Sequence, residues 1–258
     1  RVVPFLETAA GSTSPEVRMR ASSLLKLMRV DPLEAFCAQR DEQLDIEQGM
    51  VLIAQILHPQ VKPADIKRQF DEIAAKVRAK LGKDYSPTKT DPQVAVTALR
   101  TVIFDDLNFD GNKDDYNNPD NNSIARVLET KKGKPITLAR LVVLVAKRLE
   151  IPIVGVPASG RYLVKYDGQQ APAGFSKADI YFSPFEGGKI LSREDRQMQY
   201  PSHDPDVMVA PDGNRAVLER SLRNLTSDLD HDATNAAKLT RAVYMLELLR
   251  TKSPQFPR

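Results

Sequence analysis

The sequence predicts an α+β fold in which a buried central helix packs on an antiparallel sheet. Apolar residues recur at helical spacing through the first third of the chain. The stretch 135–149 is apolar almost all round, and short apolar runs separated by glycines follow it. A helix without a polar face has to be surrounded by other elements. We therefore expect an N-terminal helical layer, a core of helix and sheet, and a C-terminal helical hairpin.

The N-terminal layer is expected to be entirely helical. Serine followed by Pro15 and an early acid is typical of a helix start, and Pro32 and Pro63 open later stretches in the same way. The expected helical stretches are 15–28, 32–36, 46–57, a run from residue 63, and 94–107. The apolar face expected on the first of them consists of Val17, Ala21, Leu24, Leu25 and Met28.

The second half of the chain begins with a polar stretch, NFDGNKDDYNNPDNNS, that is expected to be a loop. After the central helix, strands are expected at 151–156, 162–166 and 180–182. The apolar positions that mark two last helices are Val217, Leu218, Leu222 and Leu225, then Leu239, Val243, Leu246 and Leu249. We divide the chain into an N-terminal helical segment (1–30), a core (31–200) and a helical pair (208–258).

Composition and charge exclude several kinds of protein. The chain has 258 residues, a net charge of +3, no Trp and 6% aromatic residues, and its basic and acidic residues are interspersed. A nucleic-acid interface would gather basic residues on one face beside stacking aromatics. No apolar run approaches the roughly 18 residues of a membrane span. We therefore expect no nucleic-acid partner, no membrane span and a cytoplasmic location; because the chain begins with Arg1, we expect a segment upstream.

Cysteine and histidine are too scarce for most metal or redox sites. Cys37 is the only cysteine, which excludes an internal disulfide and a thiolate cluster, and its place on an apolar helical face predicts a small buried hydrophobe. His58, His203 and His231 lie in separate segments without the close spacing of metal-binding helices. No cofactor is expected.

Several strings resemble known families. GKPITLARLVVLVAKRLEIP is similar to the helix that carries the catalytic cysteine in transglutaminase-like and papain-like proteins. More closely, the chain resembles the bacterial SirB-one-like branch, with a transglutaminase-like core of the second type. The matching strings are IEQGMVLIAQ, FDGNKDDYNNPDNNSIARVLETKKGKPITL, GVPASGRYLVKY, YFSPFEGGKILSRED and SLRNL. The resemblance implies tetratricopeptide-like helices over 214–250, and SPEVRMRASSLLKLM resembles the second helix of a HEAT-type repeat.

The resemblance also implies where a catalytic triad would lie. Pro135 occupies the place of the nucleophilic cysteine, Arg161 that of the histidine and Ser183 that of the aspartate. Acyl transfer needs a nucleophile, a base that activates it and a group that orients the base. Proline has no side-chain heteroatom, and arginine cannot act as a base. We therefore expect a catalytically inactive protein, a pseudoenzyme that serves as a scaffold or interaction module for a protein partner of unknown identity.

Two alternatives use the region of the cleft differently. A hydrolase or acyl transferase with relocated groups would employ Thr137, Ser159 or Ser183. No histidine lies near these positions in the sequence, so this alternative requires His203 to fold back onto Ser183 or Thr137. Arg161 and Lys165 are four residues apart in a strand and therefore on one face, where they could bind an anion in the cleft or form an exposed basic stripe.

The third alternative is a calcium-responsive module. In the segment 106–117, the residues at positions one, three, five and nine of an EF-hand loop are Asp106, Asn108, Asp110 and Asp114. The twelfth position holds Asn rather than the bidentate Glu, which weakens the match.

Overall fold

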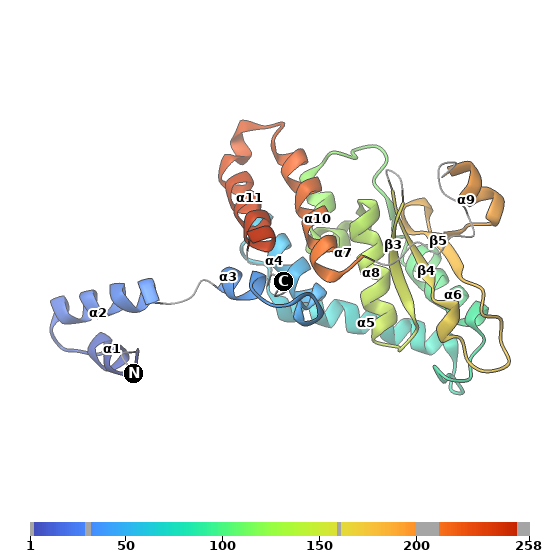
Figure 1. The fold of residues 1–258 in the computed structure, drawn as a ribbon, viewed down its shortest axis with the longest axis horizontal. Helices are drawn as coiled ribbons and strands as arrows, with labels where there is room; N and C mark the ends of the chain where they lie inside the picture. The colour runs from blue at the N-terminus through green and yellow to red at the C-terminus, as the bar shows by residue number, and fades with distance from the viewer. Residues whose placement is uncertain (1–2, 29–31, 159–160, 200–211, 252–258) are drawn as a thin grey trace, which may run out of the picture.

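The computed structural model describes residues 3–28, 32–158, 161–199 and 212–251, and it has the expected α+β architecture. Helices make up the first third and the C-terminal end, and an antiparallel sheet lies between them along the chain (Figure 1). The fold class predicted from the sequence is confirmed. Within these ranges no helix combines the length and the apolar character needed to cross a bilayer.

The first two helices, α1 (Val3–Ala10) and α2 (Pro15–Met28), pack against each other and lie apart from the other helices (Figure 1). The start of α2 at Pro15 agrees with the prediction, whereas the sequence did not predict α1. The expected apolar face of α2 is only partly buried, because α1 is its main neighbour: Ala21 is buried, while Val17 and Leu24 are 44% and 48% exposed. The side chains of Leu25 and Met28 lie outside the described part of the structure.

The helical layer that follows agrees closely with the sequence pattern. It consists of α3 (Pro32–Cys37), α4 (Ile46–Leu57), α5 (Pro63–Leu81) and α6 (Pro92–Arg100), which continues into a π-helical segment, η2 (Thr101–Asp106). Local chemistry fixes the starts, since Asp45 and Asp91 accept hydrogen bonds from backbone N–H groups of the first turns of α4 and α6. Cys37 is buried, as predicted.

The central helix is α8 (Pro135–Lys147), which follows α7 (Ile124–Thr130). Eleven of its 13 residues are buried, because α8 packs against α5 and α7 as well as the sheet. The sheet has the order β3 (Ile153–Ala158), β4 (Arg161–Tyr166), β5 (Ile180–Ser183) and β6 (Lys189–Ile190), with every pair antiparallel. A second, parallel pair joins β1 (Asp110–Gly111) to β2 (Lys132–Gly133) just before α8.

Side chains alternate across β4. Tyr162 and Val164 join the main core together with α8, whereas Leu163 joins a small apolar cluster with Val156 and Tyr181. Ser183 shares its face of β5 with Tyr181, because the two are two residues apart in one strand. The helix α9 (Arg193–Gln199) follows β6.

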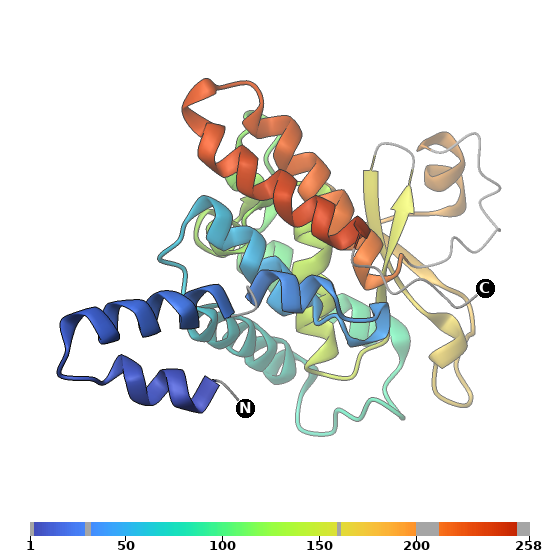
Figure 2. The same cartoon turned by 60° about the vertical axis from the view of Figure 1, so that its left-hand side comes forward.

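The C-terminal hairpin of α10 (Asn214–Leu229) and α11 (Ala236–Thr251) lies over α4 (Figure 2). The four apolar positions expected on α10 are buried in the main core. The expectation for α11 was wrong at Val243, which is 42% exposed, whereas the expected Leu246 and Leu249 are buried. The buried residues of α11 are Ala242, Met245, Leu246, Leu248 and Leu249.

Candidate functional site

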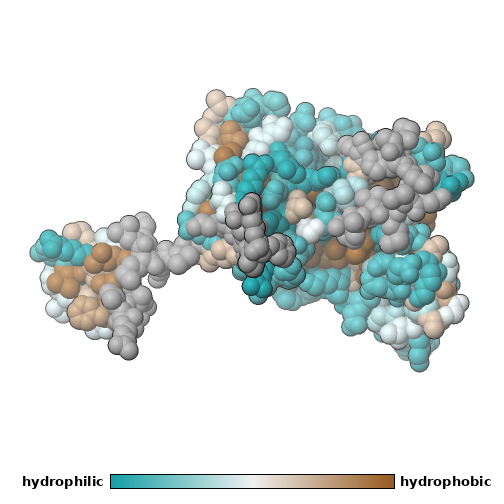
Figure 3. All heavy atoms as spheres, in the orientation of Figure 1, coloured by the Kyte–Doolittle hydropathy of each residue, from teal (hydrophilic) through white to brown (hydrophobic). Residues whose placement is uncertain are grey.

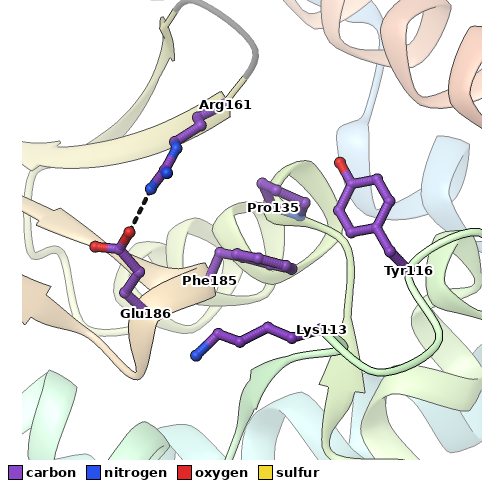
Figure 4. Close-up of a pocket in the computed structure, with 6 residues that line it drawn as sticks. All are labelled: Lys113, Tyr116, Pro135, Arg161, Phe185 and Glu186. Carbon is purple, nitrogen blue, oxygen red and sulfur yellow. Dashed lines mark hydrogen bonds and ion pairs between the residues drawn. The ribbon is translucent and has the colours of Figure 1, made fainter. Parts of the chain in front are cut away.

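The candidate site lies at the amino end of α8. Lys134 has an extended backbone and Pro135 takes the first helical position, so the helix begins abruptly there. A hollow of about 390 Å³ opens beside Pro135 (Figure 4). Its lining residues are Lys113, Tyr116, Pro135, Arg161, Phe185 and Glu186.

Side chains from three further segments meet Pro135 of α8 in this hollow. Tyr116 comes from the loop after β1, and its ring packs edge to face on Phe185 with centroids 5.7 Å apart. Phe185 and Glu186 belong to the turn after β5. Arg161, at the start of β4, extends toward Glu186 and forms an ion pair with it (Figure 4). The wall of the hollow is therefore mostly apolar, with one ion pair.

A second hollow of about 320 Å³ adjoins the first, and the two share Tyr116, Pro135 and Arg161. Its further lining residues are Ile136, Tyr162, Arg220, Arg223 and Asn224. The last three belong to α10, so the C-terminal hairpin forms part of the wall. We call the two hollows together the cleft.

A buried guanidinium lies behind Tyr162. Arg140 of α8 is only 4% exposed, donates a hydrogen bond to the Tyr162 hydroxyl and lies 5.0 Å from the centre of its ring. Burial lowers the pKa of Arg140, which nevertheless stays charged because an arginine pKa starts so high. Burial also raises the pKa of Tyr162 to about 12, so this phenol is neutral and does not act as a base.

A buried ion pair joins α10 to the residue before α8. Lys134 Nζ lies 2.8 Å from Asp228 Oδ1, and both side chains are at most 5% exposed. The other carboxylate oxygen of Asp228 accepts a hydrogen bond of 2.7 Å from Asn122 Nδ2. Lys134 also lies 4.5 Å from the centre of the Tyr116 ring. The amino end of α8 is therefore held against the C-terminal hairpin.

The structure brings together two of the three positions assigned to a triad. Pro135 and Arg161 line the same hollow. Ser183 does not line it: the residue is 1% exposed at the end of β5, on the face of the small apolar cluster. Thr137, proposed as a relocated nucleophile, is also 1% exposed, and among the described residues its hydroxyl has no hydrogen-bond partner. Ser159 and His203 lie outside the described residues.

The expected pairing of Arg161 with Lys165 as an anion site is wrong for this structure. Lys165 is 1% exposed, and its Nζ lies 2.7 Å from Asp179 Oδ2. The ammonium is buried against Asp179, so a ligand in the cleft cannot reach it, whereas the paired Arg161 is exposed. Arg220 and Arg223 of α10, rather than Lys165, line the cleft together with Arg161.

The acidic stretch proposed as a calcium loop is divided among different contacts. Asp106 forms an ion pair with Lys80 at 3.3 Å, and Asp110 lies in β1 within 3.7 Å of Lys113. Among the described residues, no group of three or more His, Cys, Asp or Glu side chains is arranged to hold a metal. His58 instead lies 2.7 Å from Asp120 at the end of α4.

Most of the cleft is formed by residues that are distant in the sequence, and the sequence did not predict them. The residues it did not single out are Lys113, Tyr116, Phe185, Glu186, Arg220, Arg223 and Asn224. The one local signal was the pair Arg220 and Arg223, whose spacing of three residues places both on one helical face. Nothing in the pattern indicated that this face meets α8.

The fold and the cleft together define a protein of the transglutaminase-like class, with a helix that begins at a cleft and packs along an antiparallel sheet. The family model described as the transglutaminase-like superfamily matches residues 64–223, from α5 into α10. The chain belongs to the transglutaminase-like superfamily.

Several curated proteins are similar to this chain. A UPF0162 protein of Xylella fastidiosa is 32% identical over 141 residues, which cover 51% of this chain and 48% of that protein. F-box only protein 21 of Homo sapiens is 27% identical over 213 residues, or 76% of this chain and 34% of that protein. A UPF0162 protein of Pseudomonas aeruginosa is 26% identical over 203 residues, or 76% of this chain and 69% of that protein.

The chain thus spans about half the length of the Xylella protein and about a third of F-box only protein 21. No solved structure matches the chain at a significant level.

Proposed function

We propose that this chain is a catalytically inactive member of its superfamily that acts as a protein-interaction or scaffold module. The proposal is based on the identity of the residue at the amino end of α8, where a nucleophile would have to lie. Pro135 begins the central helix there and lines both hollows, and it has no atom with which to attack an acyl group. Beside it, Arg161 is ion-paired with Glu186 and cannot serve as a base.

Burial argues against a relocated nucleophile. A hydroxyl that attacks a substrate has to contact it, yet Thr137 and Ser183 are each 1% exposed. The relatives support a modular role, because the matching region occupies only part of longer chains such as F-box only protein 21. That relative is named for an F-box, which favours a setting of protein interactions.

We further propose that the chain belongs to the SirB-one-like branch and that α10 and α11 are tetratricopeptide-like. Two antiparallel helices joined by a short turn, with one face buried against α4, are consistent with such a pair. The recognition surface is then the cleft or the helical flanks. The exposed apolar residues of the N-terminal pair, visible as brown patches in Figure 3, offer one such flank. They are Phe5, Val17, Met19 and Leu24.

One experiment separates inactivity from relocated chemistry. The purified chain and its Pro135→Ala, Thr137→Val and Ser183→Ala variants are incubated with amide and ester substrates and with a fluorophosphonate that labels nucleophilic hydroxyls. We expect all four proteins to match the buffer control. Turnover or labelling that Thr137→Val or Ser183→Ala abolishes would establish the hydrolase instead.

A second experiment tests the interaction. The tagged chain is used to isolate a discrete partner from the source cell, and the complex is then rebuilt from purified components. We expect Thr137→Val to bind as wild type does, because its hydroxyl is buried. A charged substitution of the exposed Val243 on α11 tests the hairpin surface. Failure to rebuild any complex from purified components would count against the scaffold role.

A further inference from the structure

Arginine side chains from two elements converge on the cleft. Arg161 comes from β4, and Arg220 and Arg223 come from one face of α10; all three line the second hollow. Arg223 is exposed and Arg220 is half-buried, with its guanidinium 5.5 Å from the centre of the Tyr162 ring. The stacking restricts the orientation of Arg220 and leaves its N–H groups to be shared with another acceptor.

Among the described residues, the second hollow is lined by three arginines and by no carboxylate, and the Asp212 carboxylate interacts with Tyr162 and Arg140 beside it. Glu186 pairs with Arg161, and Asp228 is occupied by Lys134. Within the part of the chain that the structure describes, no carboxylate lies within ion-pair distance of Arg220 or Arg223. Guanidinium groups bind carboxylates and phosphates through paired N–H···O bonds. The hollow is therefore electrostatically complementary to an oxyanion.

The amino end of α8 reinforces this charge. Ile136, in the first turn, lines the second hollow, and the residue before the helix supplies no side chain that caps the free backbone N–H groups. A helix of 13 residues carries partial positive charge at that end.

The remaining walls indicate a ligand larger than a free ion. Tyr116, Pro135 and Phe185 present apolar surface, and the two adjoining hollows measure about 320 and 390 Å³. Sites of this size generally hold ligands with apolar parts and a few polar groups. A nucleic-acid backbone needs an extended track of basic side chains. The three arginines instead converge on one hollow, and Glu186 lies in the wall of the adjoining hollow.

We infer that the cleft binds an acidic peptide segment of a protein partner, whose oxyanion is held by Arg161, Arg220 and Arg223 while neighbouring apolar side chains lie on Tyr116 and Phe185. This inference rests on the proposed interaction function and names the chemistry of the segment recognised. Carboxylate and phosphate are the same ligand chemistry for guanidinium groups, so either acidic residues or a phosphorylated residue can supply the oxyanion.

Fluorescence anisotropy with the full chain tests the inference. The probe is a labelled synthetic peptide in which Glu alternates with Leu and Phe; comparison peptides carry Gln in place of Glu, or one phosphoserine among Gln. We expect the acidic or the phosphorylated peptide to bind, the Gln peptide not to bind, and the affinity to fall as salt is raised.

Three variants locate the site. Arg223→Gln keeps the fold because the side chain is exposed, and it should weaken binding about three- to tenfold through the loss of one charge-assisted contact. Glu186→Gln should tighten binding, since it removes the internal competitor for Arg161. Arg241→Gln, an equal charge change at an exposed position of α11 outside both hollows, should leave the affinity unchanged.

Other outcomes would overturn the inference. Equal binding by wild type and Arg223→Gln would place the peptide elsewhere, and absence of binding would remove the site. If inorganic phosphate alone, or an oligonucleotide, bound more tightly than either peptide, the ligand class would be wrong. The proposed function fails independently, through catalytic turnover or through the absence of any reconstituted partner. A partner that binds wild type and Arg223→Gln equally would leave that function standing while refuting this inference.

Discussion

The buried ion pair between Lys134 and Asp228 gives the most demanding test of how the C-terminal hairpin is held. The change is Asp228→Asn, which removes the negative charge and retains an oxygen that can accept the hydrogen bond of Asn122. Both charged side chains are at most 5% exposed and lie 2.8 Å apart, so water cannot replace the lost carboxylate. Breaking a buried pair in this way typically costs about 3–5 kcal/mol.

That cost should be visible in urea unfolding. With a denaturant slope of about 2–3 kcal/mol per molar, a loss of about 3–5 kcal/mol lowers the unfolding midpoint by about 1–2.5 M. Proximity of the Lys134 ammonium to the Tyr116 ring offsets part of the penalty, which favours the lower end of the range. The slope itself should stay constant if the hairpin unfolds together with the core that it shares.

A double-mutant cycle separates the ion pair from other effects of the change. The variant Lys134→Met/Asp228→Asn removes both charges and should regain most of the lost stability, because no uncompensated cation remains. The exposed pair Arg68 and Glu72, at 2.8 Å, provides the matched control, and Glu72→Gln should leave the midpoint unchanged. A cost for Asp228→Asn below about 1 kcal/mol, or additive single-mutant effects, would refute the reasoning.

Three further predictions concern buried polar groups. Tyr162→Phe removes the hydroxyl that accepts a hydrogen bond from Arg140 and should lower the unfolding free energy by about 1.5–3 kcal/mol. Because the pKa of Tyr162 is raised to about 12, wild type should also lose stability between about pH 10 and 12 as this phenol ionises. An identical alkaline unfolding profile for Tyr162→Phe would contradict this prediction. Thr137→Val removes a buried hydroxyl that has no hydrogen-bond partner in the described part of the chain, and it should raise the thermal midpoint through a gain of about 1 kcal/mol in unfolding free energy; a loss of stability would mean that the hydroxyl has a role. Burial alone would raise the pKa of Asp179, but the hydrogen bond from Lys165 holds this pKa below its ordinary value of 3.8. The stability that ionised Asp179 contributes is therefore complete above pH 3.8 and is lost as the pH falls further. Asp179→Asn should not show this loss of stability in acid, and an acid unfolding profile equal to that of wild type would rule it out.

The sequence by itself determined most of the secondary structure. The helix starts at Pro15, Pro32, Pro63 and Pro135 follow from local chemistry, because proline fits the first helical turn and little else in a helix. The apolar pattern likewise predicted that α8 is buried almost all round and that the four marked positions of α10 are buried. The pattern failed at Val243, because packing of α11 against α10, α3 and α4 decides which of its apolar residues are buried.

Only the tertiary structure decided the composition of the cleft. The sequence placed Pro135 and Arg161 in one site through a family resemblance, but it also included Ser183 and Lys165, which the fold buries elsewhere. Burial within the sheet and a neighbouring charge exclude these two side chains from the cleft: Ser183 and Lys165 are each 1% exposed, and Lys165 is paired with Asp179. Lys165 lies far from Asp179 in the sequence pattern but within 2.7 Å in space, and an ion pair of that kind cannot be read from spacing.

The arginines of α10 likewise show that the sequence did not predict which residues line the cleft. Their helical spacing is written in the chain, yet their role depends on a crossing between α10 and the start of α8, nearly ninety residues away along the sequence. That crossing is fixed by shared burial of apolar faces and by the Lys134–Asp228 pair, interactions that depend on distance in space. Local sequence chemistry therefore specifies the elements, and long-range packing assembles the site.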